Sequence, residues 1–339
     1  MEQRPRYMVG IDIAAESFAA TALTSPGHQV FVKEQVPNTP EGFSDLCTAL
    51  ETHHISVDQV VVVIEATGVY AEPLCYFLEA KGYEVALEPP NQVKKAFTSK
   101  RKTDPVDSRQ IAEYGYRYFD KLHFWKPKAE LLEQIHSVLT TRELLTKQLT
   151  AHRNALQALE RKVVKTPVAI RMHQKNIQRL VKNIQTLDQA IKEFIDQDPD
   201  LKAKAALAQS VPGVGQLLTA NLMVITRGFT QHMNPKSLAA YAGICPYEHR
   251  SGSSVNKKPK SDRHGTGRIR KLLHLAARSV ATHKVSFRKY FLRKTEEGKP
   301  KKLTLNNIAN QLLRIICAVV TSNTPYIENY RSVNPALLR

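Results

Sequence analysis

The chain has 339 residues, enough for two or three domains, and its composition, 42% hydrophobic and 24% charged, excludes a disordered protein. Its 49 lysines and arginines against 31 acidic residues give a net charge of +18, which favours a polyanionic partner such as nucleic acid. No apolar run approaches the ~20 residues of a membrane span, and the N-terminus lacks the apolar stretch of a signal peptide, so we expect no membrane partner.

Short strand-like and helix-like patterns alternate over residues 1–126. The predicted strands are Tyr7–Ile13, Phe18–Thr24, Gln29–Glu34, Gln59–Glu65 and Tyr83–Leu87. The predicted helices are Thr39–Leu50, Ala71–Lys81 and Pro105–Tyr118. Three strands followed by helices that alternate with further strands are the order of an α/β domain with an RNase H-like mixed sheet, although periodicity alone leaves other α/β folds open.

Leucine and isoleucine recur with a 3.5-residue alternation in two stretches of residues 127–200, interrupted at Arg142 and His152. This spacing predicts two long helices that pair as a coiled-coil hairpin. A layer of a plain helical bundle has the same pattern, so a role as an oligomerisation arm stays open. After the polar break Asp196–Asp200, residues 201–330 are predicted to form a basic, mainly α-helical C-terminal domain.

Four acidic residues of the N-terminal domain are candidates for metal-dependent chemistry. Asp12 lies within an apolar strand, where burial of a lone carboxylate is costly unless it is paired or binds a cation, and Glu65 ends the Val-rich strand. Asp104 and Asp107 share one face at a helix start, where they also suit an N-cap and a first-turn charge beside Pro105. Phosphoryl chemistry on DNA uses two divalent cations bridged by carboxylates, and oxygen ligands suit Mg²⁺.

A basic stretch lies in the C-terminal domain between residues 250 and 271, with a single acidic residue, Asp262. Its glycines and serines leave backbone amides free to approach phosphates, so we predict a nucleic-acid contact rather than a solvated loop. The predicted contact residues are Arg250, Lys257, Lys258, Lys260, Arg263, Arg268, Arg270 and Lys271.

The same stretch contains the serines Ser251, Ser253 and Ser254. A serine is an ordinary loop residue unless a neighbour activates it. Arg250 would lower the cost of a serine alkoxide, and His249 is a candidate proton acceptor.

Two other features of the sequence are a Gly-containing turn and four scattered cysteines. The segment Ser210–Gln216, SVPGVGQ, resembles one helix-hairpin-helix turn with amides aimed at a DNA backbone, or else a tight turn between helices. The cysteines are scattered without a CxxC pair, which indicates buried thiols in a reducing compartment. We therefore expect a cytoplasmic protein in contact with the bacterial nucleoid. They are Cys47, Cys75, Cys245 and Cys317.

These segments together resemble the transposases of the insertion-sequence-110 family, the DEDD-type recombinases related to the Piv DNA invertases. The resemblance covers nearly the whole chain, and the order and spacing of the motifs make it specific. The N-terminal, RuvC-like motifs are GID at Gly10–Asp12, IEATGVY at Ile64–Tyr70 and KTDPVDSRQIAE at Lys102–Glu113. The C-terminal motifs are SVPGVG at Ser210–Gly215, AYAGICPYEHRSG at Ala240–Gly252 and HGTGRIRKLL at His264–Leu273.

The resemblance implies that Asp12, Glu65, Asp104 and Asp107 are a catalytic DEDD set that binds Mg²⁺ or Mn²⁺. It implies that Ser251, the serine just before the glycine, is the nucleophile that forms a transient 5′-phosphoserine link with DNA. Donor and target DNA would be exchanged through a junction by a homodimer or homotetramer.

The resemblance further implies guidance by a structured non-coding (bridge) RNA, with base pairing reading sequence while the protein reads shape and backbone. The Lys-rich stretch after Ser251 is long, which leaves Ser253 open as the nucleophile and the individual lysines without an assigned base.

Two alternatives remain at this point. One is a metal-dependent Holliday-junction-type nuclease that uses the four carboxylates without a serine intermediate. The other is a non-catalytic nucleic-acid-binding protein with a decayed RNase H-like domain, against which stands the presence of an acid at all four positions.

Overall fold

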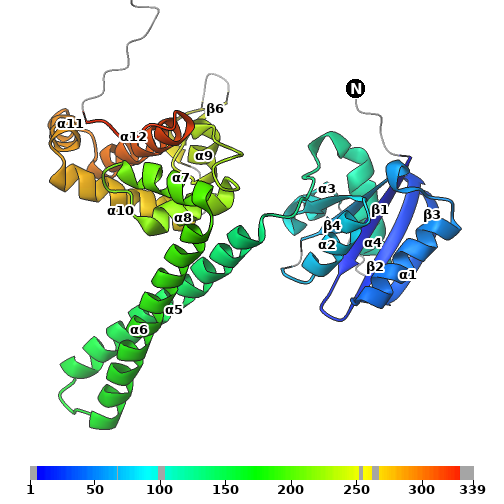
Figure 1. Cartoon of the computed structure of the whole chain (residues 1–339), viewed down its shortest axis with the longest axis horizontal. Coiled ribbons are helices and arrows are strands. Elements are labelled where there is room, and N and C mark those ends of the chain that lie inside the picture. Colours follow the sequence, from blue (N-terminus) through cyan, green and yellow to red (C-terminus); the bar gives the residue numbers. More distant parts are fainter. Residues whose placement is uncertain (1–5, 67, 98–103, 252–254, 262–266, 329–339) are drawn as a thin grey trace, which may run out of the picture. The chain divides into compact units, whose positions relative to one another are not determined.

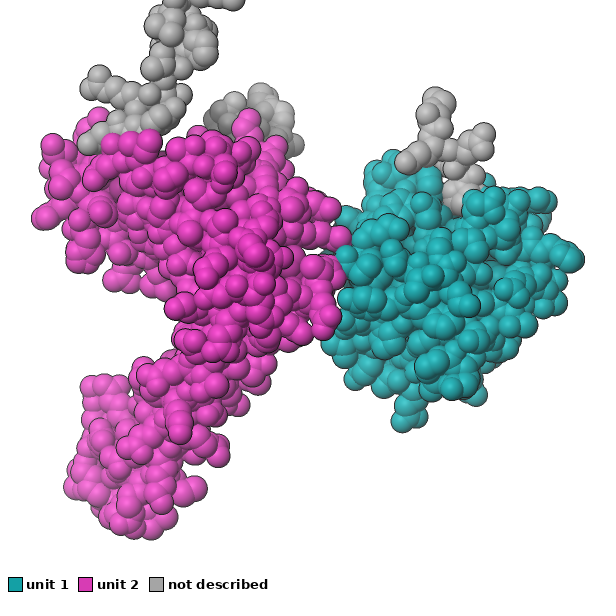
Figure 2. All heavy atoms as spheres, viewed as in Figure 1, with its two compact units in different colours: residues 1–127 teal, residues 128–339 magenta. Residues whose placement is uncertain are grey.

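The computed structural model divides the chain into two compact units, residues 1–127 and 128–339 (Figure 2). The described residues are 6–66, 68–97, 104–251, 255–261 and 267–328, and for 104–106, 246–251 and 255–261 only the backbone is described.

Unit 1 is built on a five-stranded mixed sheet in the order β3-β2-β1-β4-β5 (Figure 1). Its strands are β1 Tyr7–Ile13, β2 Ser17–Ser25, β3 His28–Pro37, β4 Val60–Glu65 and β5 Glu84–Glu88. β2 runs antiparallel to both of its neighbours, β1 and β3, and β4 and β5 continue parallel to β1. This order confirms the RNase H-like sheet that the sequence predicts.

Helices cover both faces of the sheet. They are α1 Pro40–Thr52, α2 Glu72–Ala80, α3 Pro90–Ala96 and α4 Asp104–Arg117, with short 3₁₀ turns at Val57–Gln59 and Phe119–Lys121. Alternate strand residues point to opposite faces, so the sheet has two cores. Val9, Ile11 and Val62 pack with α1 and α2, whereas Met8 and Val63 pack with α3 and α4.

Unit 2 begins with a helical hairpin of α5 Glu130–Arg161 and α6 Pro167–Gln197, which extends away from the other helices of the unit (Figure 1). Leu149, Leu180 and Ile184 are buried between the two helices. The polar residues that interrupt the apolar pattern are paired across the hairpin. Arg142 binds Asp188, and His152 Nδ1 lies 2.8 Å from the Nδ1 atom of His173.

The rest of unit 2 is mainly helical, as predicted, with one two-stranded sheet. Its elements are α7 Pro199–Ser210, α8 Gln216–Ile225, α9 Pro235–Tyr241, β6 Pro246–Ser251, β7 Val255–Ser261, α10 Gly267–His283, α11 Val285–Glu296 and α12 Lys301–Thr321. Helix α12 is long and apolar enough to cross a membrane, by length and composition only. Half of its apolar 18-residue segment is buried inside the unit, where Leu312, Leu313 and Ile316 lie in the core.

Candidate active site

Asp12 and Glu65 lie at the same end of two neighbouring parallel strands. Ile11 of β1 is in register with Ile64 of β4, and each acidic residue follows directly after its member of that pair. Asp12 shares its face of β1 with Gly10, and both acidic side chains are half-buried. The strand register therefore sets these two carboxylates side by side on the α4 face of the sheet.

Helix α4 reaches this end because Gly10 has no side chain. A Cβ atom at Gly10 would lie 2.2 Å from the backbone oxygen of Ser108 and 2.2 Å from the backbone nitrogen of Ala112. Further along the helix, Gly115 lies against Met8 and the Val63 side chain. Helix α4 thus runs antiparallel to β1, and its N-terminus points to the end of the strand that carries Asp12.

The first turn of α4 contains the other two predicted acids. Asp104 is its first residue, and the half-buried Asp107 precedes Ser108, whose hydroxyl oxygen lies 2.8 Å from Thr21 Oγ1 in the core. A helix N-terminus carries partial positive charge, which favours carboxylates there. The fold therefore brings Asp12, Glu65 and the backbone of both α4 acids to one end of the sheet.

The predicted ligands on β1, β4 and α4 are carboxylates, and carboxylate oxygens are the ligands that a hard divalent cation such as Mg²⁺ prefers. The side chain of Asp104 is not among those described. Among those that are, no three His, Cys, Asp or Glu side chains are close enough to hold a metal, and Lys94 Nζ lies 4.0 Å from Glu65 Oε1. The donor types fit such a cation, while a full ligand shell is not seen in the described residues.

Sequence reasoning missed a fifth carboxylate, Glu88, which is in register with Glu65 and fully buried. Its Oε1 accepts a hydrogen bond of 2.7 Å from the His123 backbone amide, and the His123 ring Nδ1 lies at 3.1 Å. The Tyr114 hydroxyl donates to Oε2 at 3.4 Å, and burial together with the Glu88 charge raises the pKa of Tyr114. Only its place as a charged residue at the end of an apolar strand, like Glu65, could have indicated it.

The second group of predicted residues lies in unit 2, on the two-stranded sheet and on α10. Ser251 is the last residue of β6 and is in register with Val255, the first residue of β7. Arg250 lies on β6, and Lys257, Lys258 and Lys260 lie on β7. Ser253, Ser254 and Arg263 lie outside the described residues.

This basic stretch, for which the sequence predicts no strand, therefore contributes to a two-stranded antiparallel sheet. The two strands, PYEHRS and VNKKPKS, are polar, so the sequence shows no apolar alternation from which they could be predicted.

The three basic residues on α10 differ in their surroundings. Arg268 is ion-paired through Nε with Glu143 of α5, and Arg270 Nη1 donates to the Gly243 carbonyl oxygen at 3.5 Å. Burial tends to raise the pKa of Glu143, but hydrogen bonds from Arg268 and Lys147 outweigh burial and lower it. Lys271 is exposed. Arg268 therefore joins α10 to the hairpin as well as contributing positive charge.

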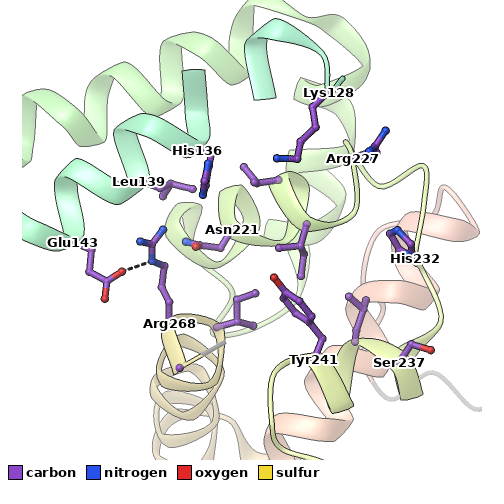
Figure 3. A pocket seen from close by; sticks show the side chains of 15 residues that line it. Lys128, His136, Leu139, Glu143, Asn221, Arg227, His232, Ser237, Tyr241 and Arg268 are labelled. Carbon is purple, nitrogen blue, oxygen red and sulfur yellow. Dashed lines mark hydrogen bonds and ion pairs between the residues drawn. The ribbon is translucent and has the colours of Figure 1, made fainter. Parts of the chain in front are cut away.

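The ion pair of Arg268 and Glu143 borders a cavity of about 930 Å³ (Figure 3). Polar and aromatic side chains from several elements of unit 2 point toward it, and Tyr241 is half exposed. Besides Arg268, four side chains of the lining can carry positive charge, and none of them was predicted from the sequence. They are Lys128, His136, Arg227 and His232. Lys128 is paired with Glu133 at 2.9 Å, and the rest of the lining includes the apolar side chains of Leu139, Val224 and Ile225, so the cavity has a mixed lining.

The turn at Ser210–Gln216 packs inside unit 2. A Cβ atom at Gly213 would lie 2.8 Å from Val280 Cγ1 and 3.0 Å from the Ala276 oxygen, both in α10. Ser210 Oγ accepts a 2.8 Å hydrogen bond from the Tyr326 amide. These contacts favour the interpretation as a tight turn between α7 and α8.

Two family models match the chain. The model of the IS110 DEDD domain, described as "Transposase", matches residues 9–165, and the model described as "Transposase IS116/IS110/IS902 family" matches residues 205–292. The first match includes all four predicted acids, and the second includes Ser251 and the basic residues around it.

Three curated relatives align over almost their full length. The pilin gene-inverting proteins of Moraxella lacunata and Moraxella bovis are each 29% identical over 94% of this chain and 97% of their own. The transposase for insertion sequence element IS1111A of Coxiella burnetii is 23% identical over 94% of this chain and 91% of its own.

Proposed function

The chain belongs to the IS110 family of transposases, and from this premise we propose that it cleaves and rejoins DNA through a serine hydroxyl, assisted by divalent metal ions at the DEDD residues. Membership makes the chain an enzyme of DNA transposition. The serine intermediate, the metal and the roles of individual residues are the finer parts of the proposal.

The carboxylates Asp12, Glu65, Asp104 and Asp107 would hold Mg²⁺ or Mn²⁺. A divalent ion at this place would offset the negative charge that develops on a reacting phosphoryl group. The observation that carries the proposal is the parallel register of β1 and β4, together with α4 pressed onto Gly10, which directs acids distant in sequence to one end of one sheet.

Ser251 would be the nucleophile. Its hydroxyl oxygen forms a bond to the phosphorus of a phosphodiester while the bond from phosphorus to the 3′ oxygen breaks. The serine proton passes to a base, for which His249 is the nearby candidate, and the leaving 3′ oxygen takes up a proton. The product is a 5′-phosphoserine link. The 3′ hydroxyl of another strand then attacks the phosphorus, which re-forms a phosphodiester and releases the serine hydroxyl. Arg250 would stabilise the negative charge of the attacking oxygen.

The basic residues around the serine would hold DNA by its phosphates, since point charges on lysine and arginine suit the backbone. Arg250, the lysines of β7, Arg263, Arg270 and Lys271 are assigned to this contact. Arg268 joins them with part of its charge taken up by Glu143. We also propose a dimer or tetramer, because an exchange of strands needs two duplexes and more than one serine. A structured guide RNA is proposed on the resemblance to the family alone.

Trapping tests the serine step. The protein is incubated with element-end DNA and a divalent metal, denatured, and examined for a covalent protein–DNA adduct. We expect an adduct with the wild-type chain and with Ser253→Ala but none with Ser251→Ala. Strand cleavage without any adduct would overturn the serine step and favour the metal-dependent nuclease. An adduct that depends on Ser253 would move the nucleophile to that residue.

A further inference from the structure

Charge is strongly segregated along the helical hairpin. The outer hairpin, defined as residues 147–182, contains nine basic residues and one acidic residue, Glu160. The basic residues are Lys147, Arg153, Arg161, Lys162, Lys165, Arg171, Lys175, Arg179 and Lys182. The inner hairpin, residues 130–146 and 183–197, has two basic residues, Arg142 and Lys192, against six acids. A hairpin that needed charge only for solubility would mix both signs along its length.

All nine basic side chains of the outer hairpin are exposed. Lys147 is paired with Glu143 at 3.2 Å, and Lys165 Nζ donates to the Glu160 carbonyl oxygen. For the other seven, the described part of the chain offers no carboxylate within ion-pair distance. Their charge is therefore available to a partner.

Four of these residues form one row on α6. Arg171, Lys175, Arg179 and Lys182 follow one another at spacings of four, four and three residues, which places them on a single face of the helix. The buried residues Leu180 and Ile184 face α5 instead. At 1.5 Å of rise per residue, the row is about 16 Å long, whereas a DNA duplex carries a phosphate charge about every 1.7 Å of its axis.

This arrangement costs the helix stability, because like charges four residues apart repel one another. A negatively charged partner that lies along the row would remove that repulsion and release its own counterions. The outer hairpin has no Phe, Tyr or Trp, so it lacks the stacking platforms with which proteins bind single strands. A straight row of point charges on a stiff helix fits the backbone of a double helix.

We propose that the outer hairpin is a binding arm for duplex DNA, which contacts phosphates through the row Arg171, Lys175, Arg179 and Lys182 on α6. The proposal rests on the proposed function, because that function supplies the DNA. It extends the contact surface to an element outside the serine-bearing sheet and α10.

The test compares two variants of the full chain. The neutral variant combines Arg171→Gln, Lys175→Gln, Arg179→Gln and Lys182→Gln, and glutamine is a good helix former. The exchange variant combines Arg171→Lys, Lys175→Arg, Arg179→Lys and Lys182→Arg, which keeps every charge. Binding of a labelled DNA duplex is measured by fluorescence anisotropy between about 50 and 200 mM salt, a range over which phosphate contacts change affinity steeply.

We expect the neutral variant to bind at least about tenfold more weakly, with a salt slope smaller by about 3 to 4, since each phosphate contact contributes about 0.9. The exchange variant should bind like the wild type. The melting temperature of the neutral variant should be unchanged or higher, because repulsion is removed, so misfolding would not explain a loss of binding. Equal affinity and slope in the neutral variant and the wild type would overturn the proposal.

Two other results would also overturn it. If the neutral variant changes the oligomeric mass but not DNA affinity, the row is a contact between copies of the chain. If an RNA duplex of the same length binds more tightly than DNA and depends on the same four residues, the partner is RNA. The adduct assay, run in parallel, separates this inference from the proposed function. A wild-type chain that forms no adduct contradicts the proposed serine step, whatever the binding assay shows for the hairpin.

Discussion

Arg142 of α5 donates two hydrogen bonds to Asp188 of α6, from Nε to Oδ1 at 2.5 Å and from Nη2 to Oδ2 at 3.0 Å. Both side chains are partly buried, and the pair lies where the apolar pattern of α5 is interrupted. A two-pronged ion pair has a defined geometry, so it sets the register in which the two helices pack.

Loss of this pair should loosen the hairpin. We expect Asp188→Asn to lower the free energy of opening α5 and α6 by about 1–3 kcal/mol, because hydrogen bonds to charged groups contribute that much and Arg142 would lose its counter-charge. Hydrogen exchange of the amides in both helices measures the change. Glu193→Gln, on the exposed surface of α6, is the control and should leave protection unchanged. Equal protection in all three proteins would contradict a register-setting role.

A side chain at position 10 should disrupt unit 1. Gly10→Ala places a Cβ 2.2 Å from backbone atoms of Ser108 and Ala112, which cannot move without shifting α4. We expect a loss of roughly 1–3 kcal/mol or more from overpacking, together with loss of activity, because α4 would lift the Asp104 and Asp107 turn away from the sheet. Thermal unfolding and the adduct assay measure the two effects. Gly215→Ala, where an added Cβ meets nothing within 4 Å, is the matched control. A Gly10→Ala protein as stable as this control would argue against the close packing of α4.

The carboxylate of Asp12 should matter for chemistry but not for DNA binding. In Asp12→Asn the side chain keeps its size but loses the charge that a divalent cation needs. We therefore expect strand cleavage to fall by at least roughly 100-fold with DNA affinity nearly unchanged. Chelation of divalent metal should reduce the wild type to the same level, and added Mg²⁺ should restore the wild type alone. An Asp12→Asn variant with full activity would refute the metal site.

Unit 1 should lose stability in alkaline solution. Burial raises the pKa of Tyr83 from 10.0 to about 12, and burial raises that of the Cys75 thiol from 9.0 to about 12. When the folded-state pKa is the higher one, the unfolded chain releases its proton first, so stability is complete below pH 9 and is lost as the pH rises toward 12. Denaturant unfolding across this range should show the decline, and Tyr83→Phe should make it shallower. An unchanged slope in Tyr83→Phe would mean that Tyr83 ionises equally in both states.

Much of unit 1 could be predicted from the sequence, because its strands are buried and their apolar patterns are strong. β1 begins and ends as predicted, and the predicted helix Pro105–Tyr118 differs from α4 by one residue at each end. The short helix α3, Pro90–Ala96, was not predicted, since only Val93 of its seven residues is buried and so no apolar period forms. The β6–β7 sheet was missed for the related reason that its strands are polar.

The candidate site was predictable in its residue types but not in its neighbours. An acid at the end of a buried strand, such as Asp12 or Glu65, is visible in the sequence, because apolar residues precede it. The partners of a polar residue are not visible, because they come from distant segments. Arg142 and His152 therefore looked like interruptions of a pattern, and the pairing of Arg268 with Glu143 could not be foreseen.

The parallel register of β1 and β4 also bears on errors in folding. A shift of β4 by a single residue against β1 would turn the whole strand over, so that Glu65 would face the core with α1 and α2 while Asp12 stayed in place. In such a chain the valines of β4 would face the wrong helix layer. Glu65 would no longer lie beside Asp12. Correct alignment of one strand thus secures the packing of the core and the pair of acids together, so a misaligned chain would lose stability and activity at once.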